Sequence, residues 1–171
     1  NNADLHFLRE LRSALSTGDP DRLAAVRSVR EQELEMMTQA DLVLSYNEVE
    51  HSVIASHTEG KARVMTCPWV VHIPGRVPPL KGRRGLSFLG SFNHYPNAEG
   101  VKWFCAEVMP RLEGPRTKLT IYGSGMGPDI VGLASDRIDP AGFIERISDA
   151  YDRHRVFVAP LLSGAGIKGK V

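Results

Sequence analysis

The first forty residues carry the pattern of two helices separated by a short break. Apolar residues recur at helical spacing at Leu5, Leu8, Leu11 and Leu15. The tripeptide "GDP" at 18–20 interrupts this pattern, and Asp19 can cap a second helix that has Pro20 at its first position. The stretch that follows, residues 21–40, is rich in helix formers and is expected to continue that helix.

Residues 40–72 show a strand, a helix and a second strand. The short apolar run "ADLVLSY" at 40–46 is typical of a buried parallel strand. Asn47, with Glu50 three positions later, has the spacing of a capping box and predicts a helix, which Gly60 ends. The stretch "KARVMTCPWVVH" at 61–72 is the next expected strand. This αβαβ order predicts an α/β fold with a parallel sheet.

A change of composition then predicts a domain boundary. Residues 73–84, "IPGRVPPLKGRR", contain three prolines, two glycines and four basic residues, which is the composition of a linker. We therefore expect one domain part at 1–74, a linker at 75–84 and a second domain part at 85–171.

The second part repeats the strand and helix pattern. A strand is expected in "GLSFLGSF" at 85–92, which reaches Gly90, and a helix at 97–112. The apolar positions of that helix are Val101, Phe104, Cys105, Val108 and Leu112. Further elements are expected as a strand at 117–125, a short helix at 128–135, an edge-like strand at 138–144, a helix at 147–154 and a strand at 155–162.

Composition and charge exclude several classes of protein. The chain has 171 residues, 42% hydrophobic and 24% charged, which is ordinary for a globular domain and excludes intrinsic disorder. The net charge of +1 gives no case for a nucleic-acid partner. Residues 81–171 carry 13 Lys and Arg against 9 Asp and Glu. That bias would suit an anionic small ligand, although a solvated surface gives the same count.

The cysteines and the ends of the chain bear on its location and completeness. Cys67 and Cys105 are far apart in the sequence, and we interpret them as buried free thiols of a reducing compartment, here the cytoplasm. No segment resembles a signal peptide or an 18-residue apolar span. The chain opens on "NNADLHF" and ends inside the glycine-rich stretch "SGAGIKGKV", so we expect it to be a piece of a larger enzyme.

Glycine-bearing turns follow four strands of the second part. They are "LGSFNHYPN", "YGSGMG", "AGFI" and "LLSGAGIKGK". In an open parallel sheet, ligands bind outside the carboxyl ends of the strands, where glycine lets backbone N–H groups approach a phosphate. Four such turns within about 80 residues indicate a ligand site better than one turn would.

The turn "YGSGMG" does not fit a dinucleotide fingerprint. Its glycines at 123, 125 and 127 do not have the G-x-G-x-x-G spacing, and no acidic residue ends a strand about 20 residues later. An NAD site is therefore disfavoured, and the alternative for this stretch by itself is a plain turn between a strand and a helix.

Taken together, these stretches resemble a known enzyme family. "LSFLGSFNHYPNAEGVKWFCAEVMPRL", "KLTIYGSG", "AGFI" and "RVFVAPLLSGAGIKGKV" occur in the order and at the intervals of the donor-binding domain of retaining family-4 glycosyltransferases with the GT-B fold. The first part, with "DLH" and "ADLVLSYNEVE", resembles the end of their acceptor-binding domain. The resemblance implies two Rossmann-like parts with parallel sheets, both incomplete in this chain.

The resemblance also implies roles for individual residues. The donor would be a nucleotide-diphosphate sugar, bound as a substrate with no separate cofactor, and His6 would face its sugar as the catalytic residue from the first part. Asn97 would follow the diphosphate along the cleft. The remaining implied donor-binding residues are Gly90, Ser91, Asn93, His94, Gly123, Ser124, Phe143, Ile144, Gly164, Ala165, Gly166, Ile167 and Lys168.

Some features of the family are missing from the chain. The glutamate that holds the donor ribose would lie just past Val171, so the 171-residue chain is expected to show negligible sugar transfer by itself. A basic pair after the first strand of the donor domain is not evident, because Lys102 lies too far along its helix. No zinc spacing occurs, and no DxD motif occurs in the donor-binding part at 85–171, which predicts a metal-independent site.

Several interpretations remain open at this stage. The expected function is transfer of a hexose-like sugar to a sugar, lipid-linked or glycan acceptor in glycan biosynthesis, with retention of configuration and room for peripheral membrane association. The alternatives are a GT-B nucleotide-sugar epimerase and a non-catalytic binding module. The alternative for His6 is a surface or helix-start histidine, and the alternative for Lys168 is a solvated loop charge.

Overall fold

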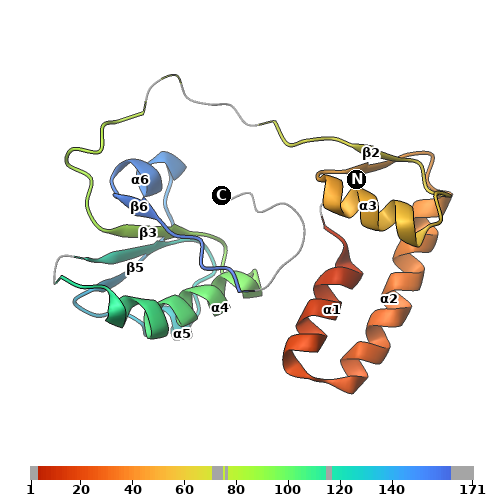
Figure 1. The fold of residues 1–171 in the computed structure, drawn as a ribbon. Coiled ribbons are helices and arrows are strands. Elements are labelled where there is room, and N and C mark those ends of the chain that lie inside the picture. The colour runs from red at the N-terminus through yellow and green to blue at the C-terminus, as the bar shows by residue number, and fades with distance from the viewer. Residues whose placement is uncertain (1–3, 71–74, 76, 115–116, 163–171) are drawn as a thin grey trace. The chain divides into compact units, whose positions relative to one another are not determined.

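The computed structural model describes residues 4–70, 75, 77–114 and 117–162. Of these, the residues up to 70 form one compact unit, called unit 1, and those from 75 to 162 form a second, called unit 2. Their helices and strands are drawn in Figure 1. The described strands form two separate parallel sheets, so the predicted α/β fold with Rossmann-like parts is confirmed. The boundaries predicted for the domains stay a prediction.

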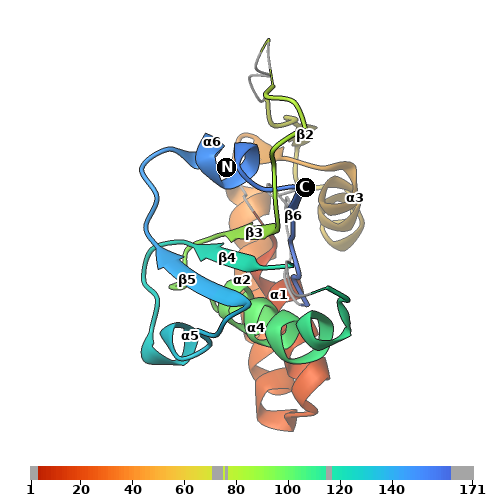
Figure 2. The same ribbon diagram turned by 90° about the vertical axis from the view of Figure 1, so that its left-hand side faces the viewer.

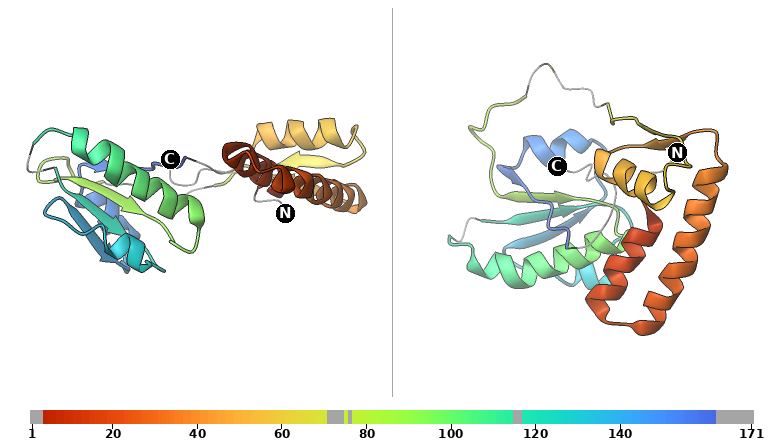
Figure 3. Two further views of the ribbon diagram at one scale, coloured as in Figure 1. Left: turned by 90° about the horizontal axis from the view of Figure 1, so that it is seen from below. Right: turned by 45° about the vertical axis from the view of Figure 1, so that its right-hand side comes forward.

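Unit 1 begins with two helices that run side by side (Figure 3). Helix α1 (His6–Thr17) ends at Gly18, whose φ of 64° lies in the left-handed region that glycine adopts most readily. Helix α2 (Pro20–Gln39) starts as predicted, because the Asp19 side chain accepts hydrogen bonds from two N–H groups of its first turn. Leu5 and Phe7 are buried, whereas Leu15 is exposed, so the apolar face of α1 ends before the helix does.

A βαβ unit completes unit 1. It consists of β1 (Val43–Ser45), α3 (Glu48–His57) and β2 (Val64–Thr66), and the two strands pair in parallel. The Asn47 side chain caps α3 by accepting from the Glu50 N–H at 2.8 Å, as predicted. Both strands are shorter than the apolar runs suggested. Strand β1 ends early because the Ser45 hydroxyl donates to the Asn47 carbonyl and turns the chain into α3.

Unit 2 is a four-stranded parallel sheet with helices on both faces. Its strands are β3 (Leu86–Leu89), β4 (Leu119–Tyr122), β5 (Ile138–Gly142) and β6 (Val156–Phe157), in the order β5-β4-β3-β6. Figure 2 shows α4 (Tyr95–Trp103) and α5 (Pro128–Val131) on one face and α6 (Ile147–Asp152) on the other. Strand β5 lies at an edge of the described sheet, as predicted, where Pro140 is tolerated.

The helix predicted at 97–112 is not uniform. It starts at Tyr95, and after Trp103 it continues as a π-helical turn (Phe104–Val108) and a 3-10 turn (Met109–Arg111). Pro110 explains the change, because it has no N–H to donate to the fourth preceding carbonyl. The predicted apolar face is confirmed, since Val101 and Phe104 are buried in a core that includes Phe88 and Ile121.

The prediction that both cysteines are buried is wrong for one of them. Cys105 is buried in the core of unit 2, and burial raises the pKa of its thiol to about 11. Cys67 is exposed, because it lies just beyond the three-residue strand β2 rather than inside a longer one.

Reaction with a thiol reagent should therefore separate the two cysteines. We expect Cys67 to react with dithionitrobenzoate within minutes at pH 8, whereas Cys105 should stay unmodified until the protein unfolds. Besides being inaccessible, only about one Cys105 thiol in a thousand would be ionised at that pH, and the thiolate is the reactive form. Absorbance should report one thiol per chain in buffer and two in urea. A Cys67→Ser variant that reacts in buffer would contradict this assignment.

Candidate functional site

The carboxyl ends of the unit 2 strands bring three glycine-bearing turns together. Strand β3 leads into Gly90, β4 leads into Gly123, and β5 ends at Gly142. The Gly90 N–H donates to the Tyr122 carbonyl at 3.1 Å, and the Gly123 N–H donates to the Gly142 carbonyl at 2.8 Å. The turns expected from the sequence are thus neighbours at one edge of the sheet.

These contacts correct part of the reasoning from the sequence. The N–H groups of Gly90 and Gly123 extend the sheet and are not open to a ligand. Gly123 is required for a different reason: its φ is 153°, and a Cβ atom there would lie 1.8 Å from the Gly90 carbonyl oxygen. The glycine therefore allows two backbone turns to touch.

Other backbone N–H groups at this edge have no hydrogen-bond acceptor among the described residues. Among the residues that the structure describes, no acceptor receives the N–H groups of Ser91, Asn93, Ser124 or Gly125. The side chains of Ser91, Asn93, His94 and Ser124 are also exposed. Backbone and side-chain donors of two neighbouring turns are thus available to one ligand.

Helix α4 starts directly beside these donors. No described side chain caps its first turn, so the positive end of the helix dipole is open to an anion. Asn97, expected along the cleft, is buried instead, and its amide donates to the Ser91 carbonyl at 2.7 Å. Asn97 therefore holds the turn in place. Lys102 lies farther along α4 and forms an ion pair with Asp129 at 2.8 Å, a hydrogen bond that raises its pKa.

The end of β5 supplies an apolar surface next to the polar turns. Phe143 is 75% exposed and Ile144 is half-buried. A large exposed aromatic ring beside backbone donors can stack on a planar ring, as a nucleotide base would require. Phe143 and Ile144, two of the implied donor-binding residues, thus lie at the same edge of the sheet as the turns at Gly90 and Gly123. Gly164, Ala165, Gly166, Ile167 and Lys168 lie outside the described residues.

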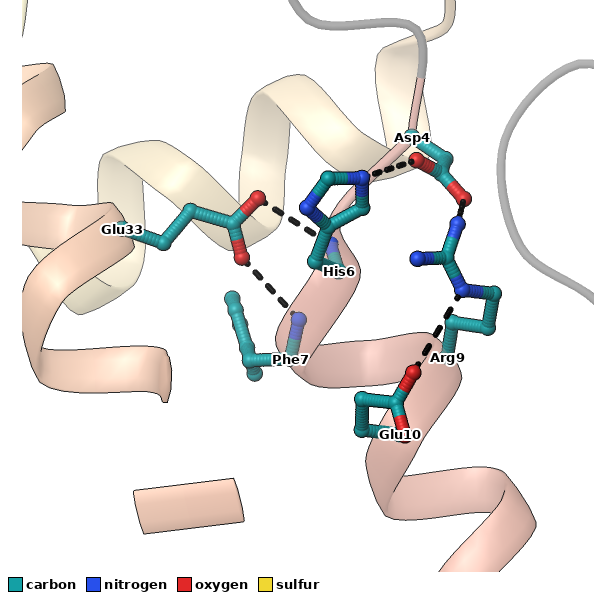
Figure 4. Close-up of polar contacts among 6 residues, drawn as sticks. All are labelled: Asp4, His6, Phe7, Arg9, Glu10 and Glu33. Carbon is teal, nitrogen blue, oxygen red and sulfur yellow. Dashed lines mark hydrogen bonds and ion pairs between the residues drawn. The ribbon is translucent and has the colours of Figure 1, made fainter. Parts of the chain in front are cut away.

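The His6 region belongs to unit 1 and is built differently (Figure 4). The His6 side chain is 59% exposed, and its Nε2 atom lies 3.3 Å from Asp4 Oδ1. The buried Glu33 carboxylate reaches across from α2 and accepts the N–H groups of His6 and Phe7, each at 3.0 Å. Glu33 thus does for α1 what a capping side chain does.

Neither of these two carboxylates was predicted from the sequence. Asp4 is part of "DLH", and its spacing two residues before His6 could have indicated the pair. No local signal marks Glu33, which lies 27 residues from His6 in the sequence. The ring of His6 is thus oriented by Asp4, and its backbone is fixed by Glu33.

Comparison with known protein families identifies the family to which the second half of the chain belongs. Residues 83–171 match the family described as Glycosyl transferases group 1, and the match includes every turn described above. The chain belongs to this family. As a group 1 glycosyltransferase it is a transferase of glycosyl groups, with a sugar donor and an acceptor as its substrates. A search of curated proteins finds no match for the chain.

Two further observations describe the part of this group 1 glycosyltransferase that the structure covers. Its His, Cys, Asp and Glu side chains nowhere gather in threes as a metal site would need. None of its helices combines the length and the apolar character needed to cross a membrane. Metal independence stays a prediction.

Proposed function

We propose that the protein transfers a sugar from a nucleotide-diphosphate donor to an acceptor hydroxyl, with retention at the anomeric carbon and without a metal ion. The diphosphate binds at the carboxyl edge of the unit 2 sheet, against the turns that start at Gly90 and Gly123. The resemblance to retaining family-4 enzymes supports the donor class and the stereochemistry, and free thiols at Cys67 and Cys105 fit a cytoplasmic enzyme of glycan synthesis.

The observation that carries this proposal is that four N–H groups have no acceptor among the described residues. They belong to Ser91, Asn93, Ser124 and Gly125. Backbone donors held by the fold stabilise the negative charge that develops on a departing diphosphate, and they need no reorganisation during the reaction. Residues 90–97 and 123–127 contain no Asp or Glu, so no carboxylate in either turn repels the phosphates. The start of α4 adds a favourable dipole.

The proposal also assigns roles to the residues around the base and the sugar of the donor. Phe143 stacks on the base, and Ile144 contacts it beside the end of β5. His6 is the residue that acts on the sugar, as the resemblance implies, and within unit 1 its ring is held by Asp4 and its backbone by Glu33. The segment Gly164–Lys168 adds donors to the sugar and the diphosphate, as the resemblance implies.

Titration of the isotope-labelled chain with nucleoside diphosphates tests the donor site. We expect UDP, GDP or ADP to shift the amide signals of Ser91, Asn93, Ser124 and Gly125 in a saturable way, equally with and without EDTA. Removing the polar side chains in a His94→Ala/Ser124→Ala variant should raise the dissociation constant by about a hundredfold or more, because two hydrogen bonds to a charged group are lost and each contributes about 1.5–3 kcal/mol.

Ser148→Ala is the matched control, since Ser148 is exposed on α6 in the same unit. It should bind as the wild type does. Shifts confined to other residues, or binding that EDTA abolishes, would contradict the proposed site.

A further inference from the structure

A row of basic residues lies at the opposite, amino edge of the unit 2 sheet. Each described strand follows closely on an arginine or a lysine: Lys118, Arg137 and Arg155 directly precede β4, β5 and β6, and Arg84 lies two residues before β3. The parallel register pairs Leu86 with both Leu119 and Val156. Since neighbouring strands are about 4.8 Å apart, the backbone positions of Lys118 and Arg155 lie about 10 Å apart along the edge, on either side of the start of β3.

A cavity of about 800 Å³ opens among these residues. Its lining includes Arg84, Lys118 and Arg155 together with the first residues of β3 and β6. All three basic side chains are exposed, and none forms an ion pair with another residue that the structure describes. Three like charges around one cavity repel each other, so a bound anion would stabilise the arrangement.

Two neighbouring arginines, Arg83 in the lining of the cavity and Arg137 directly before β5, already donate to backbone carbonyls. The Arg137 guanidinium donates to the Leu112 and Thr117 carbonyls at 3.0 and 3.3 Å. Arg83 donates to the Tyr151 carbonyl at 3.2 Å and lies 3.8 Å from Asp152.

The remaining polar groups at this edge leave the cavity basic. His154 shares a hydrogen bond of 3.1 Å with the Tyr122 hydroxyl. Asp136 and Asp139 lie beside Lys118 along an adjoining cavity, without reaching ion-pair distance. The charge of the larger cavity is therefore set by Arg84, Lys118 and Arg155.

We propose that this amino-edge cavity binds the phosphate groups of a phosphorylated small molecule or of a lipid headgroup, at a site separate from the donor site. Arginine presents a planar fork of donors that fits phosphate oxygens, and lysine adds a point charge. The volume lies in the range of small-ligand pockets, whereas an acidic protein partner would need a contact of about 800 Å². This inference goes beyond the proposed function and does not depend on it.

Amide mapping with inorganic pyrophosphate as the probe tests the site. In the wild-type chain we expect saturable shifts at Leu86, Leu119 and Val156, which are distinct from any shifts at Ser91 and Ser124. A Lys118→Gln/Arg155→Gln variant should weaken the amino-edge response about tenfold and leave the carboxyl edge unchanged. An Arg22→Gln/Arg27→Gln variant makes the same change of net charge on α2 and should behave as the wild type.

Vesicle sedimentation distinguishes the two sources of phosphate. Retention on phosphatidylglycerol vesicles but not on phosphatidylcholine, lost in Lys118→Gln/Arg155→Gln, would assign the site to a lipid headgroup. Pyrophosphate binding without vesicle binding would assign it to a soluble phosphorylated molecule. No amino-edge shift with pyrophosphate together with no retention on vesicles, or equal affinity in the wild type and the variant, would overturn the proposal.

Discussion

Replacing Gly123 by alanine should lower the free energy of unfolding of unit 2 by about 3–5 kcal/mol, because two separate costs fall on one residue. The backbone there has a φ of 153°, which residues with a Cβ atom rarely adopt. The new Cβ atom would also lie 1.8 Å from the Gly90 carbonyl oxygen, which cannot move without breaking the end of β3. Urea unfolding followed by the amide signals of the buried residues Phe88 and Ile121 measures the loss.

Gly142→Ala is the matched control for that experiment. Gly142 also has a positive φ of 79° and accepts the hydrogen bond of the Gly123 N–H, but a Cβ atom on it would meet no atom within 4 Å. It should therefore cost only about 1–2 kcal/mol, the strain of the backbone alone. If both variants lose the same stability, the close approach of the two turns is not what requires glycine at position 123.

Much of the local structure could be predicted from short stretches of sequence. Asp19 followed by Pro20, and Asn47 followed by Glu50, identify the starts of α2 and α3, because a cap and its helix are only a few residues apart. The turns at Gly90 and Gly123 were predicted because an apolar strand followed by glycine is also a local pattern. Parallel pairing then brings such turns to one edge of a sheet without further information.

The features that could not be predicted depend on contacts between residues that are distant in the sequence. Nothing near Cys67 shows that β2 ends at Thr66, since that end is set by pairing with the short strand β1. Glu33 and His6 meet only because α1 and α2 run side by side. The glycine turns were expected to expose their own N–H groups, but sheet bonds take up those of Gly90 and Gly123, and the unclaimed donors lie one or more positions later.

Replacing Gly100 by alanine should destabilise unit 2, although the same change inside an ordinary helix stabilises a protein. Gly100 lies inside α4, where replacing glycine by alanine normally stabilises a protein by about 1 kcal/mol. Here a Cβ atom would lie 2.0 Å from the Pro160 carbonyl oxygen, in the segment that follows β6. We therefore expect Gly100→Ala to lower the free energy of unfolding of unit 2 by about 2–4 kcal/mol. The same urea titration measures it, and Gly75→Ala, where a Cβ atom meets nothing within 4 Å, should be close to neutral.

The consequence of Gly100→Ala for function follows from where Pro160 lies in the chain. Pro160 comes four residues before Gly164, the first residue of the segment that is proposed to contact the sugar and the diphosphate, and Gly100 leaves room for the Pro160 carbonyl. In the absence of urea, where unit 2 of the Gly100→Ala chain remains folded, the displacement of Pro160 should weaken the binding of nucleoside diphosphates. Pyrophosphate should still bind at the amino edge. Undiminished diphosphate binding in a folded Gly100→Ala chain would show that the segment after Pro160 contributes nothing to the donor site, while the turns at Ser91 and Ser124 would keep their proposed role.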